Sequence, residues 1–108
     1  MHILLTRPLD DCKSTILQFK SLGHTVSHIP LLSIEKINYE KKNFSEYSGI
    51  IFTSSNAIKN LNLKDLNKNI YCFCVGGATE EQAKKSGFQK IFSANWNVNN
   101  LKEIILQN

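Results

Sequence analysis

Residues 70–93 read IYCFCVGGATEEQAKKSGFQKIFS, and this stretch decides the fold. It opens on an apolar run, IYCFCV, that is typical of a strand buried on both faces. Gly76 and Gly77 allow a tight turn into a helix over residues 78–86, and the closing KIFS predicts a weaker strand at residues 90–93. A strand, a helix and a strand in this order predict two parallel strands joined by a crossover helix.

The amino-terminal part of the chain has the same order of elements. Residues 2–6, HILLT, predict a buried strand, and Asp10 or Asp11 can cap a helix after it. Along that helix, apolar residues recur at helical spacing: Cys12, Ile16, Phe19 and Leu22. Residues 25–29, TVSHI, alternate like a second strand, which Pro30 limits to an edge or to its own end.

The middle of the chain separates this first group of elements from the rest. Residues 33–48 are polar and rich in lysine, show no sustained period, and predict a linker or long loop. Residues 49–53, GIIFT, predict a third buried strand, and a helix follows the TSSN turn at its end. Residues 97–107 predict a last helix, whose apolar stripe consists of Leu101, Ile104 and Ile105.

These elements predict an α/β fold in which five parallel strands form one doubly wound, flavodoxin-like sheet with helices on both faces. We expect residues 1–108 to form a single α/β unit. Its parts are a first β-α-β segment (1–32), a linker or crossover (33–48) and a second β-α-β-α-β-α segment (49–108). No helix is predicted between the second and third strands, so this connection needs a long stretch of chain.

The composition excludes several classes of protein. Hydrophobic residues make up 42% and charged residues 20% of the 108 residues, which is ordinary for a globular domain and argues against disorder. The net charge of +4 arises from 13 basic residues that are spread along the chain, so we expect no nucleic acid partner. The first apolar run is too short for a signal peptide or a membrane span, so we expect a cytoplasmic protein without a membrane partner.

The cysteines and histidines predict neither a disulfide framework nor a metal site. Cys12, Cys72 and Cys74 are odd in number and lack the spacing of zinc ligands, so we interpret them as small apolar side chains. The three histidines have no carboxylate pattern beside them, and we assign them no function.

The turns that leave the strands are the candidate functional features, because ligands of such sheets bind outside the carboxyl ends of the strands. Two of these turns open helices, so they offer free backbone N–H groups beside small hydroxyl side chains, which suits an anion. Arg7 follows the first strand and can pair with a carboxylate. The turns contain Thr6, Arg7 and Pro8; Thr53, Ser54, Ser55 and Asn56; Gly76, Gly77, Ala78 and Thr79; and Ser93, Ala94 and Asn95.

Each of these features has an alternative explanation. Serine and asparagine are preferred helix caps, so the TSSN turn could serve capping alone. A tight turn from strand to helix needs glycine with or without a ligand, and Arg7 could be a solvated loop residue. We find no catalytic triad, no paired carboxylates, no acidic cluster of a phosphorylation receiver, no flavin-binding loop and no G-x-G-x-x-G or Walker sequence.

Four segments in register resemble the uroporphyrinogen-III synthase family: ILLTRP near the start, IPLLSIE after the second strand, GIIFTSSNAI in the middle and CVGGATEEQAKKSGF near the end. Each motif is short, but together they span nearly the whole chain in the family's order. The resemblance implies a cofactor-free enzyme that closes linear hydroxymethylbilane into uroporphyrinogen III and inverts the last pyrrole ring. In the family the terminal hydroxyl leaves to give an azafulvene, and a spiro intermediate follows.

The resemblance also implies how the substrate is held. In the family, backbone amides and hydroxyls of the strand-end turns hold the acetate and propionate groups in a cleft between two domains. The substrate-binding residues implied for this sequence are Ser54, Ser55, Asn56, Gly77 and Thr79, with Arg7 as a further candidate. The tyrosine suspected as a general acid in the family matches none of Tyr39, Tyr47 and Tyr71, so the catalytic residue is left unassigned.

The family has two such domains, and its chain crosses to the second just after the IPLLSIE segment and returns later to complete the first. The resemblance therefore implies that this chain corresponds to the amino-terminal half. Three forms are open: a fragment that a second half complements, a one-domain unit, and a domain-swapped homodimer. The alternative function is a non-catalytic module of the same fold that binds tetrapyrroles or small anions.

Overall fold

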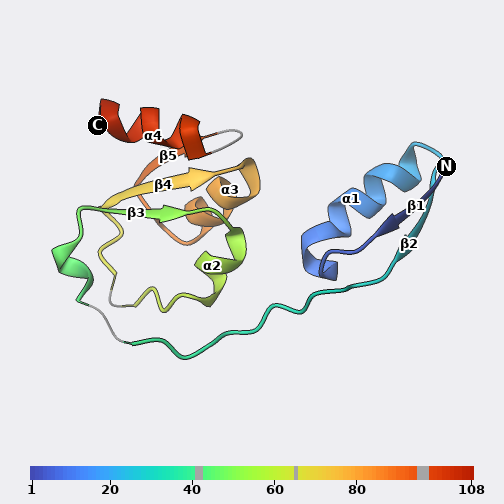
Figure 1. The fold of residues 1–108 in the computed structure, drawn as a ribbon, viewed down its shortest axis with the longest axis horizontal. Helices are drawn as coiled ribbons and strands as arrows, with labels where there is room; N and C mark the ends of the chain where they lie inside the picture. Colours follow the sequence, from blue (N-terminus) through green and yellow to red (C-terminus); the bar gives the residue numbers. More distant parts are fainter. Residues whose placement is uncertain (41–42, 65, 95–97) are drawn as a thin grey trace. The chain divides into compact units, whose positions relative to one another are not determined.

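The computed structural model describes residues 1–40, 43–64, 66–94 and 98–108. Within these ranges, strands and helices alternate along the chain (Figure 1). The elements are β1 (His2–Leu5), α1 (Leu9–Ser21), β2 (Thr25–His28), η1 (Phe44–Glu46), β3 (Gly49–Phe52), α2 (Ser55–Asn60), β4 (Tyr71–Val75), α3 (Gly77–Lys85), β5 (Lys90–Ala94) and α4 (Val98–Gln107). The chain divides into two units, Met1–Lys36 and Ile37–Asn108, each with its own sheet.

The single five-stranded, flavodoxin-like sheet predicted from the sequence is wrong. β1 pairs with β2 in one sheet, and β3, β4 and β5 form a second sheet in that order. The reason lies in the connection from β2 to β3, where residues 31–40 are exposed throughout. A crossover within one sheet would instead pack an apolar side onto that sheet. The α/β class is confirmed, and so is parallel pairing, because every strand pair runs parallel.

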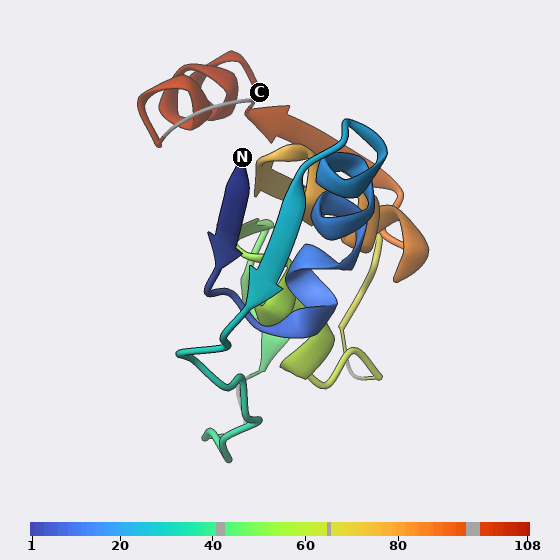
Figure 2. The same ribbon diagram turned by 90° about the vertical axis from the view of Figure 1, so that its right-hand side faces the viewer.

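The first unit is a β-α-β motif in which α1 packs beside β2 (Figure 2). The pairing of β1 with β2 continues past the strands, because the Ile29 N–H donates to the Leu5 carbonyl at 2.9 Å. Pro8 precedes α1 and makes no side-chain cap. The predicted cap at Asp10 or Asp11 is therefore wrong. Both residues lie in the first turn of α1, where their carboxylates stabilise the helix through the positive end of its dipole.

The second unit has helices on both faces of its three-stranded sheet (Figure 1), an arrangement that the sequence predicted for one five-stranded sheet. α2 and α3 cover one face, with a core of Phe52, Ile58, Leu66, Cys72, Cys74, Ala83 and Phe88. α4 covers the other face, where Leu101 packs with Phe73 and Ala94. The apolar run in β4 is explained by this arrangement, because alternate residues of this middle strand point into two different cores.

The segment between the units is expected to be the first site of proteolysis. Lys36 lies in this exposed segment, and a two-stranded sheet in about 40 residues is marginal by itself. We expect brief trypsin treatment to cut after Lys36, to spare the fragment that contains β3, β4 and β5, and to degrade the amino-terminal piece. Mass spectrometry over time would identify the fragments. Early cuts inside α3, at Lys84 or Lys85, would contradict this prediction.

Candidate anion-binding site

Two strand-to-helix turns are neighbours at the carboxyl edge of the three-stranded sheet. Phe52 pairs with Cys74, so β3 and β4 end at nearly the same level. Figure 1 shows both strands pointing to the side where α2 and α3 begin, and these two helices pack against each other. The structure thus brings together five of the residues singled out in the sequence, which are Ser54, Ser55, Asn56, Gly77 and Thr79.

The first turn is built around a helix cap. The Ser54 hydroxyl oxygen accepts a hydrogen bond from the Asn56 N–H at 3.2 Å, so Ser54 is the N-cap of α2. The capping explanation is therefore confirmed for Ser54. Its O–H can still donate to an anion, since an accepting hydroxyl keeps its own proton. Ser54, Ser55 and Asn56 are all partly exposed at this edge.

The second turn carries backbone N–H donors that have no hydrogen-bond partner among the residues that the structure describes. Gly76 precedes α3 with φ of 88°, and its N–H donates to the Ala94 carbonyl at 2.9 Å. The first hydrogen bond within the helix runs from the Glu80 N–H to the Gly76 carbonyl at 3.1 Å. The N–H groups of Gly77, Ala78 and Thr79 therefore come before the first hydrogen bond of α3. Within this helix they have no carbonyl acceptor. Gly77 and Ala78 are exposed, so a ligand can reach this end of the helix.

Gly77 has no reason within the described residues to be glycine. Its φ is not positive, and a Cβ at this position would meet none of their atoms within 4 Å. Alanine is favoured over glycine inside helices by roughly 0.5–1 kcal/mol. A glycine in open space beside free N–H groups lets a ligand approach the backbone closely. Gly76 differs, because its positive φ alone requires glycine.

Thr79 is not placed to offer its hydroxyl to a ligand. Its side chain is buried at 4% exposure, and Ala83, one turn further along α3, is buried on the same side. Thr79 is therefore better placed to offer its N–H than its hydroxyl. Glu80 adds a carboxylate nearby, and Lys84 pairs with it at 3.2 Å, which offsets its repulsion of an anion.

Ser93 lies on β5 beside Cys74 and has a buried hydroxyl without a hydrogen-bond partner among the described residues. Ala94 after it is buried, and Asn95, the last member of this turn in the sequence, lies outside the described residues.

An unsatisfied buried hydroxyl such as that of Ser93 costs about 1–3 kcal/mol. We expect Ser93→Ala to leave stability unchanged or to raise it, as measured by urea unfolding. A loss above about 1 kcal/mol would show that the hydroxyl has a partner.

Arg7 belongs to the first unit, where it follows β1. Its carbonyl oxygen accepts hydrogen bonds from His28 Nε2 at 2.6 Å and from the Cys12 thiol at 3.8 Å. These contacts hold the backbone at the end of β1, whereas the residue itself is exposed. His28, to which the sequence assigns no function, therefore supports the position of Arg7.

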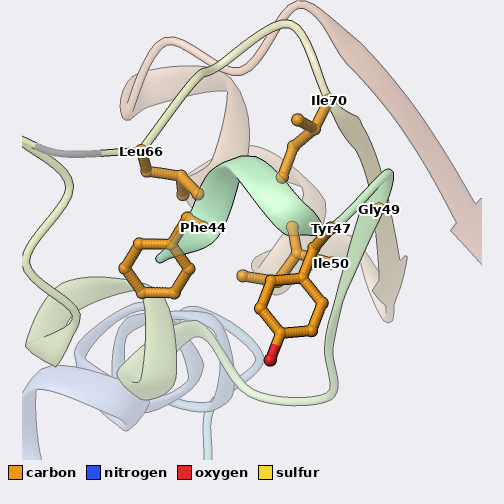
Figure 3. A pocket seen from close by; sticks show the side chains of 6 residues that line it. All are labelled: Phe44, Tyr47, Gly49, Ile50, Leu66 and Ile70. Carbon is orange, nitrogen blue, oxygen red and sulfur yellow. The ribbon is translucent and has the colours of Figure 1, made fainter. Parts of the chain in front are cut away.

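Two cavities of the second unit lie away from the carboxyl edge. One, of about 240 Å³, lies at the amino-terminal ends of β3 and β4 (Figure 3) and is lined by Phe44, Tyr47, Gly49, Ile50, Leu66 and Ile70. The other, of about 350 Å³, is lined by Ser48, Gly49, Ile51, Tyr71, Phe73, Ile105 and Asn108. Both linings are mainly apolar, so neither suits a polycarboxylate. The first cavity could not be predicted from the sequence, because Phe44 and Tyr47 lie in an otherwise polar segment that is typical of a linker.

The described residues offer no cluster of three or more histidine, cysteine, aspartate or glutamate side chains that could hold a metal ion. In the same part of the chain, every helix is too short or too polar to cross a bilayer.

The comparison with protein families gives a match over most of the chain. The model described as "Uroporphyrinogen-III synthase HemD" matches residues 13–108, which include β2 to β5 and all helices except the start of α1. A search of curated proteins gives no match.

Proposed function

This chain belongs to the uroporphyrinogen-III synthase family, and on that basis we propose that it acts in porphyrin and heme biosynthesis, as a lyase in the cytoplasm. The proposed reaction closes hydroxymethylbilane to uroporphyrinogen III with inversion of the last pyrrole ring. The family match over residues 13–108 carries this proposal. The open first turn of α3 supports it, because a substrate with many carboxylates needs donors that are free to bind anions.

In this proposal the strand-end turns orient the substrate. The N–H groups of α3 and the hydroxyls of Ser54 and Ser55 hold carboxylates of the bilane, and Arg7 pairs with another. The turns hold the flexible bilane so that its two ends lie close together in the orientation in which they react. Such positioning lowers the activation barrier and is a large catalytic effect by itself. A second polypeptide segment or a second copy of the chain would complete the site, and no cofactor is needed.

The experiment is an isomer assay on hydroxymethylbilane. Bilane that closes spontaneously gives the type I isomer, so an excess of type III reports the enzyme. We expect type III in excess when the chain is assayed with the carboxyl-terminal half of a family member. Only type I product, both with and without that half, would end the proposal.

Arg7→Ala is expected to weaken binding of uroporphyrinogen about tenfold or more, since a hydrogen bond to a charged group contributes about 1.5–3 kcal/mol. The free energy of unfolding should change by at most about 0.5 kcal/mol, because Arg7 is exposed. Equilibrium dialysis measures the affinity. The bound ligand is quantified by porphyrin fluorescence after it has been oxidised. Lys20→Ala, at an exposed basic residue of the same unit, is the control and should bind normally. Equal affinities of the two variants would remove Arg7 from the site.

A non-catalytic tetrapyrrole or small-anion binding module is the second candidate function. The observation that favours it is the chemistry of the two turns, which offer hydroxyls and backbone N–H groups, while the carboxylate of Glu80 is paired with Lys84. Such a site can bind carboxylates without moving protons. Saturable uroporphyrinogen binding combined with no type III excess would favour this function over the synthase.

A further inference from the structure

Cys72 and Cys74 form a dithiol in the core of the second unit. The two sulfur atoms lie 3.7 Å apart, close enough for a thiol hydrogen bond, and both residues are completely buried. They project from the same face of β4, the middle strand of its sheet. None of the carboxylate-binding roles proposed for the turns involves them.

The hydrogen bond between the sulfur atoms makes the two thiols unequal. It lowers the pKa of the Cys74 thiol, because the S–H of Cys72 can stabilise a thiolate on Cys74. The same bond raises the pKa of the Cys72 thiol, and burial raises it further. Cys74 is thus the thiol that ionises first, and the thiolate is the form that reacts.

The spacing along the strand permits a disulfide only under strain. Residues two apart on a strand are separated by about 6.6 Å between Cα atoms, from a rise of about 3.3 Å per residue. Disulfides span Cα separations of roughly 4.4–6.8 Å, so this pair lies near the upper end. A strained disulfide is easily reduced, which is typical of reversible rather than structural bonds.

We propose that Cys72 and Cys74 are a reversible redox pair, oxidised by glutathione disulfide to an intrastrand disulfide that destabilises the second unit. The Cys74 thiolate attacks one sulfur of glutathione disulfide and releases one glutathione thiolate. The Cys72 sulfur then attacks Cys74, displaces the second glutathione and closes the protein disulfide. Two thiols are oxidised, one disulfide is reduced, and the two thiol protons end on the two released glutathione molecules.

The oxidised form is expected to disturb β4 because neighbours pair with it on both sides. Cys72 lies between Ile50 and Ile91, and Cys74 lies between Phe52 and Ser93. Pulling the two sulfur atoms together from 3.7 Å to the bond length of about 2.05 Å shifts this part of the strand against both ladders. Since both sulfur atoms are buried, oxidation proceeds through local opening of the unit.

The test uses the intact chain in buffers of increasing glutathione disulfide, followed by alkylation and trypsin digestion. Trypsin leaves Cys72 and Cys74 together on residues 69–84 and Cys12 on residues 1–13, because it does not cut between Arg7 and Pro8. We expect the peptide 69–84 to become two hydrogens lighter and resistant to alkylation, and to revert when reduced glutathione is added. The urea midpoint of the oxidised protein should be lower than that of the reduced protein.

Cys72→Ala separates this mechanism from simple glutathionylation. Without Cys72 the reaction should stop at a glutathione adduct on Cys74, which mass spectrometry detects. A peptide 69–84 that stays fully alkylated at every glutathione ratio would overturn the proposal, and so would an oxidised protein with an unchanged urea midpoint. Both readouts come from the unmodified chain, so they hold even if the variant does not fold.

Discussion

Gly77→Ala is expected to keep the second unit folded and to weaken tetrapyrrole binding. An added Cβ meets no described atom within 4 Å, and alanine at the start of α3 should raise stability by up to about 1 kcal/mol. The same Cβ would stand where a carboxylate must approach the N–H groups of the first turn. We expect binding to weaken about tenfold or more, as when a hydrogen bond to a charged group is lost.

Gly76→Ala is the matched control for this prediction. Gly76 has φ of 88° and ψ of 151°, a region that costs other residues about 1–3 kcal/mol. This variant should lose stability, whereas Gly77→Ala should not. Urea unfolding followed by circular dichroism measures stability. Equilibrium dialysis, with the ligand oxidised to the fluorescent porphyrin before it is quantified, measures the affinity for uroporphyrinogen. If Gly77→Ala lost stability as Gly76→Ala does, or bound the ligand normally, the first turn of α3 would not be a ligand site.

Most of the local structure could be predicted because each element has a local cause. The apolar run at residues 70–75 predicts β4, and the glycine pair after it predicts the entry into α3. The helix stripe of Leu101, Ile104 and Ile105 is confirmed, since these residues pack in the core beneath α4. Periodicity and turn residues act within a few positions, so they are visible in the sequence alone.

The sheet organisation could not be predicted in the same way. A strand pattern shows that residues 2–5 and 49–52 are strands, but it does not specify that they lie in different sheets. That choice depends on the path of the connecting segment, whose residues 31–40 are exposed and have no periodic pattern. Pairing between strands far apart in sequence is a property of the whole chain.

The site shows the same division between local and long-range information. The cap role of Ser54 follows from local preference, and the structure confirms it. The burial of Thr79 also had a local signal, since Thr79 and Ala83 stand four residues apart on one face of α3. Whether Arg7 shares a ligand with Gly77 depends on two units, and no local pattern in either turn specifies this.

Ile58→Ala is expected to lower the stability of the second unit strongly. Ile58 is 1% exposed and lies in the core between α2, α3 and the sheet. Removing its side chain leaves a cavity and costs about 2–5 kcal/mol, which is a large share of the roughly 5–15 kcal/mol that stabilises a domain. α2 has only six residues, too few to be stable as an isolated helix, so its position depends on this contact.

Ile51→Ala provides a control with the same change of side chain. Ile51 lies on β3 and is 52% exposed, so the same truncation should cost about 1 kcal/mol or less. The difference between the two urea midpoints then measures the packing of α2 against the core. Because Ser54 caps α2, the Ile58 variant should also lose affinity for uroporphyrinogen, while the Ile51 variant keeps it. Equal midpoints for the two variants would mean that α2 is not held by Ile58, and the turn it supports would need another anchor.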